Sequence, residues 1–427
     1  MINVKDFGAV GDGVTMDTAA IQRAIDAGGV VNFPPGTYLT GTLYLRSYGG
    51  LHLEMGAKIL ASPNSADYNA DDFCVQNHPR PHEEASGAHL IVGVEVTHVV
   101  ISGDGIIDGN RKIFQHEILQ PSGKYAIDKW RPSQMIYFVE SDHITVRDVE
   151  LNNAPYWSLF FHGCEDVSAR GLKIYTEWRT RNGDGIDIDC CRRVTVSDCI
   201  IDTGDDCITL RADLKQLKDQ TRVCEDVVVS NCVLKTCCNA IRVGAGSGII
   251  RRAEFGNIVI HDTRTAVCLV CKYGCGNYEG AEIREIKFHD FILDCKRPFF
   301  FQSASSGPVT PEEQRMSDIE VFNFSGKAVW GSLLQGNPGY PLKRLSFRNI
   351  NVAYCGGDDV HEEEIYRAFR NCAPPEAFHL EWVADSCFDN VRIDWANASE
   401  NFKYTFLTKN CSSIALNDCQ SDRPNKM

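Results

Sequence analysis

Long uncharged apolar runs are absent from this sequence of 427 residues, and no stretch approaches the ~20 residues that a membrane-spanning helix requires. The first residues, MINVKDFGAVGDGVTMD, lack the basic segment and following apolar segment of a secretory leader, so we expect a cytoplasmic protein. The chain also lacks an excess of basic residues, because 43 Lys and Arg stand against 57 Asp and Glu. Nucleic-acid binding needs clustered cations, so we do not expect a nucleic-acid partner. Because no apolar stretch is long enough to span a membrane, we do not expect a membrane partner either.

Cysteine, in contrast, is abundant, with 19 residues. An odd number of cysteines, without a leader or a small domain, favours reduced and buried thiols over disulfides. The run CLVCKYGC (268–275) has a C-x₂-C-x₃-C spacing that could hold a metal ion. An internal row of thiols is the better prediction, because cysteines recur at equivalent places of a repeat, at Cys190, Cys199, Cys207, Cys232 and Cys237.

Hairpin signals such as Asn-Gly are scarce between the apolar segments, which argues against a large β-sandwich. One phrase recurs instead: an alternating apolar run, a polar hinge such as Asn or Asp, and a second short apolar run. Most successive copies start roughly 23 to 33 residues apart, a spacing typical of solenoids. The copies are residues 98–108, 143–153, 166–176, 193–203, 226–236, 257–267, 285–295, 318–328 and 344–354.

The period of two and the many Val and Ile residues predict strands, and neither strand of a unit can bury a face alone. Stacked units supply the missing surface. We therefore predict an all-β fold, a single-stranded right-handed parallel β-helix.

The segment TMDTAAIQRAIDAGG predicts a capping helix over about 15–28, with Asp17 or Thr15 as its N-cap and Gly28 at its end. We expect one domain, residues 1–427. Loop-rich insertions around a cleft are expected at 62–90, 108–133 and 297–315, and a less regular part after about residue 355.

Two acidic clusters lie one predicted coil apart, in NGDGIDID and DTGDDCI. Adjacent strands of a parallel sheet are ~4.8 Å apart, so Asp184, Asp205 and Asp206 can converge on one face. Crowded carboxylates repel one another, and a protonated acid beside ionised neighbours is what glycoside hydrolysis requires. Gly-Asp-Asp is also a common turn sequence, and rows of Asp can bind Ca²⁺ or face solvent.

These motifs, together with VKDFGAVGDGVTMDTAAIQRAID near the start, resemble the polygalacturonase family, glycoside hydrolase family 28, of the pectate-lyase-like β-helix superfamily. The resemblance extends over roughly residues 1–350. It implies an oligosaccharide substrate related to pectin and inversion at the anomeric carbon, with no metal or organic cofactor. It also implies that Asp205 is the general acid and that Asp184 and Asp206 activate water.

Two family signatures are altered. Where the family has G-H-G-L-S-I-G, this chain has CNAIRVG, which places Asn239 at the His position and Arg242 at a small polar position. Where the family has R-I-K, whose cations bind the galacturonate carboxylate, this chain has Cys268 and Val270, with Lys272 two residues on. Either Arg242 or Lys272 replaces those cations, or the sugar is not galacturonate.

Trp157 is a further candidate, either as a platform for a sugar ring or as a core aromatic, and Arg211 is a candidate partner of the Asp cluster. The leading hypothesis is an exo-acting hydrolase of short oligosaccharides. The alternatives are a uronate lyase or epimerase on the same scaffold, and a carbohydrate-binding protein without catalysis.

Overall fold

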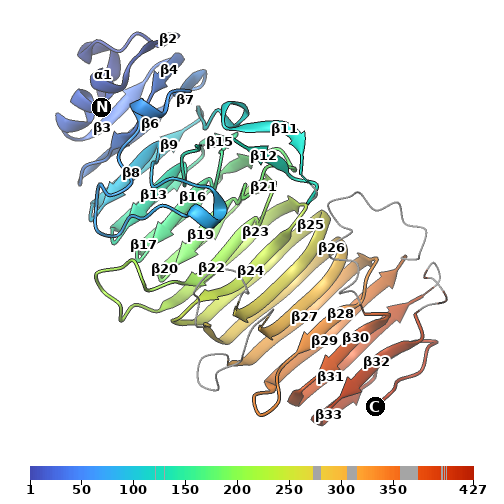
Figure 1. Ribbon diagram of the computed structural model, residues 1–427. Helices are drawn as coiled ribbons and strands as arrows, with labels where there is room; N and C mark the ends of the chain where they lie inside the picture. The colour runs from blue at the N-terminus through green and yellow to red at the C-terminus, as the bar shows by residue number, and fades with distance from the viewer. Residues whose placement is uncertain are drawn as a thin grey trace. The chain divides into compact units, whose positions relative to one another are not determined.

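The computed structural model describes residues 1–120, 122–128, 130–272, 280–304, 315–355, 374–395, 398, 400 and 402–427. It is nearly all-β, and the strands pair almost entirely in parallel (Figure 1). The chain forms two compact units. Unit 1 comprises Met1–Gln120, Lys124–Asp205 and Leu214–Arg222, and unit 2 comprises Pro121–Gly123, Asp206–Asp213 and Val223–Met427.

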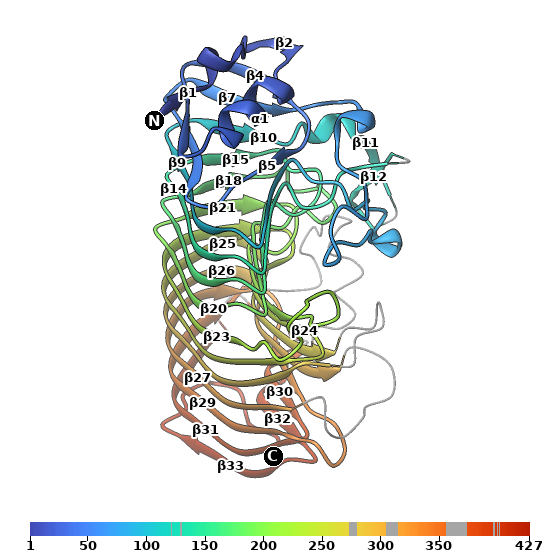
Figure 2. The ribbon, with the colours of Figure 1, turned by 90° about the vertical axis from the view of Figure 1, so that its left-hand side faces the viewer.

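In unit 1 the coils build three parallel rows of strands, here called sheets, to which most coils contribute one strand each. The first sheet contains β5 (Leu43–Tyr44), β8 (Ile91–Val94), β13 (Ile136–Val139), β16 (Leu159–His162) and β19 (Ile186–Asp189). The second contains β1 (Ile2–Asn3), β3 (Val30–Phe33), β6 (Gly49–Leu53), β9 (Thr97–Gly103), β14 (Asp142–Arg147), β17 (Glu165–Arg170) and β20 (Arg192–Ser197). The third contains β2 (Asp12–Met16), β4 (Gly36–Thr40), β7 (Ala57–Ala61), β10 (Ile106–Asp108), β15 (Glu150–Asn152), β18 (Lys173–Tyr175) and β21 (Ile200–Thr203). Figure 2 shows β10, β15, β18 and β21 stacked one on the next.

Unit 2 has the same parallel stacking, but its strands run through the corners. One row of strands contains β22 (Ile208–Ala212), β24 (Asn239–Gly246), the later parts of β25 (Ile249–Lys272) and β26 (Glu282–Ala304), β28 (Ser332–Gln335), β30 (Glu376–Glu381) and β32 (Tyr404–Lys409). The other contains β23 (Cys224–Thr236), the earlier parts of β25 and β26, β27 (Met316–Ala328), β29 (Leu342–Tyr354), β31 (Val383–Asp394) and β33 (Ser412–Asn417). Both units confirm the predicted right-handed parallel β-helix.

The polar hinges are confirmed as the corners at which the chain turns. In unit 2 the hinge asparagines have positive φ, a left-handed conformation that Asn tolerates better than most residues. Their side chains form a row of hydrogen bonds along the corner, in which Asn349 donates to Asn323 at 2.9 Å and Asn390 donates to Asn349 at 2.9 Å. Asn is therefore favoured at these corners for two reasons: it tolerates the left-handed backbone, and its side chain links neighbouring coils by a hydrogen bond.

A second row of left-handed corner residues lies in unit 1, at the start of the second-sheet strands, and we call it the corner column. Its members are His98, His143, Asp166 and Arg193. The guanidinium of Arg193 makes two bonds to Asp166, of 2.7 and 2.9 Å, and favours the ionised carboxylate, which lowers the pKa of Asp166.

The cores are built from like side chains stacked on like. Val99, Ile144, Val167 and Val194 occupy matching positions of four successive coils in unit 1. In unit 2 the stacks are aromatic, as in the ring pairs Phe255–Phe288, Phe347–Phe388 and Phe378–Phe406. Apolar stacking of this kind is the main favourable contribution to a fold whose coils touch only their neighbours.

The predicted capping helix is confirmed as α1 (Thr18–Asp26), which buries Ala20, Ile21, Ala24 and Ile25 and is followed at Gly28 by a positive φ. One detail of the prediction is wrong: Asp17 stands at the N-cap position, but its side chain does not cap the helix. Its carboxylate accepts hydrogen bonds from the backbone N–H groups of Val10 and Gly11 instead.

The expected insertions lie outside the three sheets of unit 1. Residues 62–90 contain only the short helices η2 (Ser65–Asp67) and η3 (Pro81–Glu83). Residues 108–133 contain η4 (Arg111–Ile113) and an antiparallel hairpin of β11 (Gln115–Leu119) and β12 (Tyr125–Ile127), while η1 (Val4–Phe7) precedes β2. Of the third expected loop, residues 297–304 belong to β26 and 305–314 lie outside the described residues. The part after residue 355, expected to be less regular, contains the four strands β30 to β33.

The cysteines that the structure describes, 17 in number, form no disulfide, and most are buried. Burial raises the pKa of the Cys271 thiol well above its ordinary value and so disfavours the thiolate that a metal site would need. Cys275, the third cysteine of the possible metal motif, lies outside the described residues. Among the helices described, none has the length and apolar character needed to cross a membrane.

A buried arginine fastens the two insertions of unit 1 to the coils. Arg131 is fully buried, and its burial lowers its pKa to about 10. Arg131 itself belongs to the 108–133 insertion. Its guanidinium donates to the 62–90 insertion through the backbone oxygens of Glu83 and Glu84, and to the loops that precede β16 and β19 through the backbone oxygens of Pro155 and Arg181 and the side chain of Asn182.

We predict that Arg131→Met opens both insertions, because the four backbone oxygens and Asn182 lose charge-assisted hydrogen bonds, each worth about 1–3 kcal/mol. Limited proteolysis should cut the variant faster within 62–90 and 108–133, and thermal unfolding should begin at a lower temperature. Arg147→Met is the matched control, since Arg147 is exposed and pairs only with its neighbour Asp148 among the contacts described. Equal cleavage of both variants would contradict the anchoring role.

Candidate active site

The first sheet of unit 1 is buried on both faces. Every residue of β13, β16 and β19 is buried, whereas strands of the other two sheets alternate between buried and exposed positions. The period of two therefore disappears here, and the repeated phrase of the sequence misses these strands. The loops that lead into this sheet hold the acidic clusters.

Asp184 is fixed by the loop that leads into β19. Its carbonyl accepts from the N–H of Ser158 at 2.9 Å, and the next carbonyl, of Gly185, accepts from Leu159 at 3.0 Å. The Asp184 side chain is buried, and so is that of Asp187, three residues later. Unit 1 thus concentrates acidic groups at the leading end of its first sheet.

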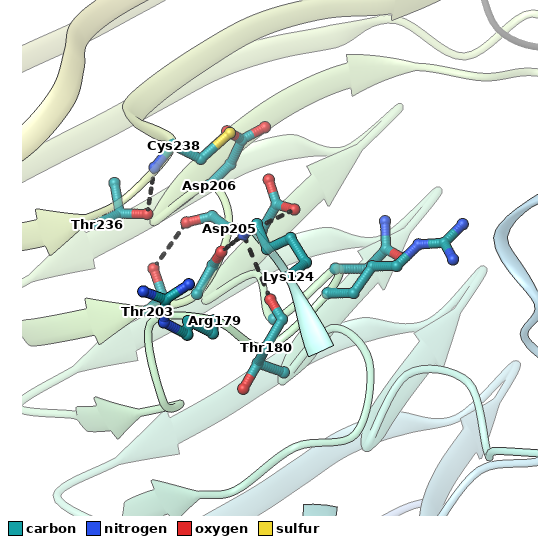
Figure 3. A network of polar contacts seen from close by, with 12 residues as sticks. Lys124, Arg179, Thr180, Thr203, Asp205, Asp206, Thr236 and Cys238 are labelled. Atoms are coloured by element: carbon teal, nitrogen blue, oxygen red, sulfur yellow. Dashed lines mark hydrogen bonds and ion pairs between the residues drawn. The ribbon is translucent and has the colours of Figure 1, made fainter. Parts of the chain in front are cut away.

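Asp205 follows β21 at the end of unit 1 and meets a cation from the hairpin insertion (Figure 3). Lys124 Nζ lies 3.8 Å from Asp205 Oδ2, with 14% and 22% of the two side chains exposed. The ammonium also donates to the backbone oxygens of Thr180, at 3.4 Å, and of Gly204. Sequence reasoning missed Lys124, because nothing in the repeat predicts which residue of an insertion returns to the coils.

Asp206, the next residue in the chain, belongs to unit 2 and has different surroundings. Its Oδ1 accepts from the backbone N–H of Asn239 at 3.2 Å and from the Asn239 side-chain amide at 2.6 Å. Arg242 Nε lies 3.6 Å from the other oxygen, Oδ2. Amide donors and a guanidinium both favour the charged carboxylate, which is the form that a base must have.

A second arginine, Arg264, extends this group within unit 2. Arg264 Nη2 donates to Asn239 Oδ1 at 3.4 Å and lies 3.0 Å from Cys238 Sγ. The backbone N–H of Cys238 donates to the Thr236 hydroxyl at 3.0 Å (Figure 3). Asn239 therefore accepts from one cation and donates to the acid, as an amide can and a carboxylate cannot. The coil register predicts this neighbour, since Asn239 pairs with Thr265, the residue after Arg264.

The other candidates are placed as follows. Trp157 is only 2% exposed, with the Arg80 guanidinium 4.7 Å above its ring, so that face is covered. Arg211 is buried in β22, and Lys272 is half-buried as the last residue of β25. Arg242 pairs in register with Cys268, the position at which the altered R-I-K motif begins.

Known proteins resemble this chain in sequence and in fold. A family model described as "Glycosyl hydrolases family 28" matches residues 76–225, and one described as "Rhamnogalacturonase A/epimerase, pectate lyase-like" matches residues 1–51. A probable polygalacturonase of Vitis vinifera is 31% identical over 375 residues, which cover 82% of this chain and 74% of the relative. An exo-poly-alpha-D-galacturonosidase of Dickeya chrysanthemi is 27% identical over 305 residues, 61% of this chain and 50% of that protein's length.

Among solved structures, a family 28 exopolygalacturonase of Yersinia enterocolitica has a TM-score of 0.64 at 20% identity, covering 99% of this chain and 76% of that one. An exopolygalacturonase of Thermotoga maritima has a TM-score of 0.65 at 19% identity, covering 97% and 91%. These two structures share the β-helix fold. With the Vitis relative and the family match, they establish that the chain belongs to glycosyl hydrolase family 28 and is an O-glycosyl hydrolase of polygalacturonase type.

Proposed function

We propose that the protein removes terminal uronic acid residues from short pectin-type oligosaccharides, with inversion at the anomeric carbon. Asp205 is the general acid, and Asp184 and Asp206 activate water. The observation that carries the proposal is the contrast between two consecutive carboxylates. Asp206 is buried and held by an amide and a guanidinium, whereas Asp205 is more exposed and lies beside a single ammonium. Different surroundings for neighbouring acids are how glycosidases separate acid from base.

In the proposed reaction Asp205 transfers its proton to the glycosidic oxygen as the bond from that oxygen to the anomeric carbon breaks. Water attacks the anomeric carbon from the opposite face and gives a proton to the carboxylates of Asp184 and Asp206. Asp205 remains as a carboxylate and regains its proton from solvent, which its partial exposure permits.

Exo action is supported by the two insertions that Arg131 holds over the loops leading into the first sheet, since such segments limit how far a chain of sugars extends. The relatives named as exo-acting enzymes, from Dickeya, Yersinia and Thermotoga, support it as well. A uronate substrate is supported by the cations near the proposed acid and base, namely Lys124 in unit 1 and Arg242 and Arg264 in unit 2.

We predict that Asp205→Asn lowers hydrolysis of oligogalacturonides roughly 10²–10⁴-fold, because an amide cannot supply the proton. New reducing ends and product lengths would be measured from the first minutes, with neutral oligosaccharides in parallel. Asp198→Asn is the matched control, an exposed aspartate that also has positive φ, as Asn tolerates.

Each outcome of this experiment bears on one part of the proposal. Early mid-chain products from the wild type would contradict exo action, and unsaturated products would indicate β-elimination instead of hydrolysis. Full activity of Asp205→Asn would remove Asp205 as the acid. Hydrolysis of the neutral oligosaccharides alone would exclude the uronate substrate.

We further predict that Lys124→Met raises KM for galacturonides about 10- to 100-fold, as expected for loss of a charge-assisted hydrogen bond to the sugar carboxylate. Binding of that carboxylate also withdraws positive charge from Asp205 and favours its protonated form. Lys124→Arg should retain most of the affinity.

Lys112→Met is the control, since Lys112 lies in the same insertion but is exposed and pairs with Glu117. Steady-state kinetics would be compared on galacturonides and on neutral oligosaccharides of equal length. Equal losses on both substrates would mean that Lys124 only holds the hairpin in place.

A further inference from the structure

Two histidines of the corner column in unit 1 stack on each other at the surface. His98 and His143 belong to adjacent coils, in β9 and β14, whose register pairs Asp142 with Thr97. The two rings lie 4.3 Å apart and are parallel within 7°. Both histidines are exposed. They follow the ends of the first-sheet strands, whereas Asp184 precedes those strands.

The hydrogen bonds around the rings determine which nitrogens carry protons. Asp142 is ionised at neutral pH, because hydrogen bonds from Thr97 and His143 lower its pKa. The Thr97 hydroxyl donates to this carboxylate, which can only accept.

The Thr97 oxygen is therefore left to accept from His98 Nδ1, 2.8 Å away. His143 Nδ1 donates to Asp142 at 2.5 Å. In the neutral form, both imidazoles consequently carry the proton on Nδ1 and a lone pair on Nε2.

We propose that His98 and His143 bind a divalent transition-metal ion such as Zn²⁺ through Nε2, at a site separate from the proposed catalytic residues. Imidazole and carboxylate groups are ligands that Zn²⁺, Ni²⁺ and Cu²⁺ share. One ligand atom each from His98, Asp142 and His143 lies within 4.8 Å of the others. The carboxylate of Asp166, 3.8 Å from His143 Nε2, is in reach as a third ligand.

The carboxylate–imidazole pair of Asp142 and His143 is the arrangement that orients histidines toward metals and raises their basicity. Two nitrogens at ordinary Zn–N distances in a tetrahedral site are about 3.3 Å apart. The rings must turn about their side-chain bonds so that both lone pairs point at one ion, and the exposure of both side chains permits this. The ion would join two adjacent coils and so stabilise the folded unit.

The test is a Zn²⁺ titration of the metal-free full-length protein by calorimetry at pH 7.5, with thermal unfolding in parallel. The variant His98→Asn/His143→Asn keeps residues that accept positive φ, so the corners should remain folded. We expect the wild type to bind one more ion than this variant and to be stabilised by Zn²⁺, while the variant is not. His261→Asn, which alters a partly exposed histidine beside an aspartate, is the control and should bind as the wild type does.

Two further measurements separate this site from uptake of Zn²⁺ by cysteines. Asp142→Asn should weaken binding about 10- to 100-fold through loss of the supporting carboxylate. Lowering the pH from 7.5 to 5.5 should weaken it roughly 100-fold, because an imidazole binds a metal ion only in its deprotonated form. Among the described residues, the other titratable groups next to these rings are Tyr48, whose ring stacks on His98 at 5.1 Å, and Asp166, which is paired with Arg193. Equal binding by the wild type and the double variant would overturn the proposal.

Discussion

The parallel register of neighbouring coils is the constraint on which the rest of the structure depends. Each residue lies about 4.8 Å from its equivalent in the next coil, so the side chains at equivalent positions are direct neighbours. Equivalent positions therefore carry side chains that tolerate or attract one another. The Asn row of unit 2, the Asp166–Arg193 pair and the stacked Phe rings are three solutions of this kind.

The same register brings charged side chains close together. At the candidate active site this gathers the acidic groups, and on the corners the charges are balanced by ion pairs. On the corners, acidic and basic residues alternate and pair. In unit 1, Asp205 is paired with Lys124 from an insertion. In unit 2, Asn239 and Arg242 surround Asp206, and Arg264 donates to Asn239. The altered family signatures fit this view, because cations remain near the acids although they no longer stand in the R-I-K motif.

Much of this could be predicted from the sequence, and the failures share a cause. The hinges and the two sheets beside them follow from a local period of two, and Asn323 and Asn349 are recognisable from the repeat alone. The first sheet does not follow, because its strands are buried on both faces and the alternation is lost. Lys124 could not be predicted, since its place depends on the path of a hairpin. Arg264 could have been found, because it lies one coil after Cys238 in a register that the repeat provides.

The central claim is that Asp205 protonates the leaving oxygen while Asp184 and Asp206 direct water to the opposite face of the sugar. The most direct measurement is proton NMR of the anomeric signal of the sugar released first, recorded before mutarotation. From an α-linked galacturonide the account predicts the β-anomer as the initial product. Initial release of the α-anomer would contradict it, because retention requires one of the carboxylates to form a covalent bond to the sugar.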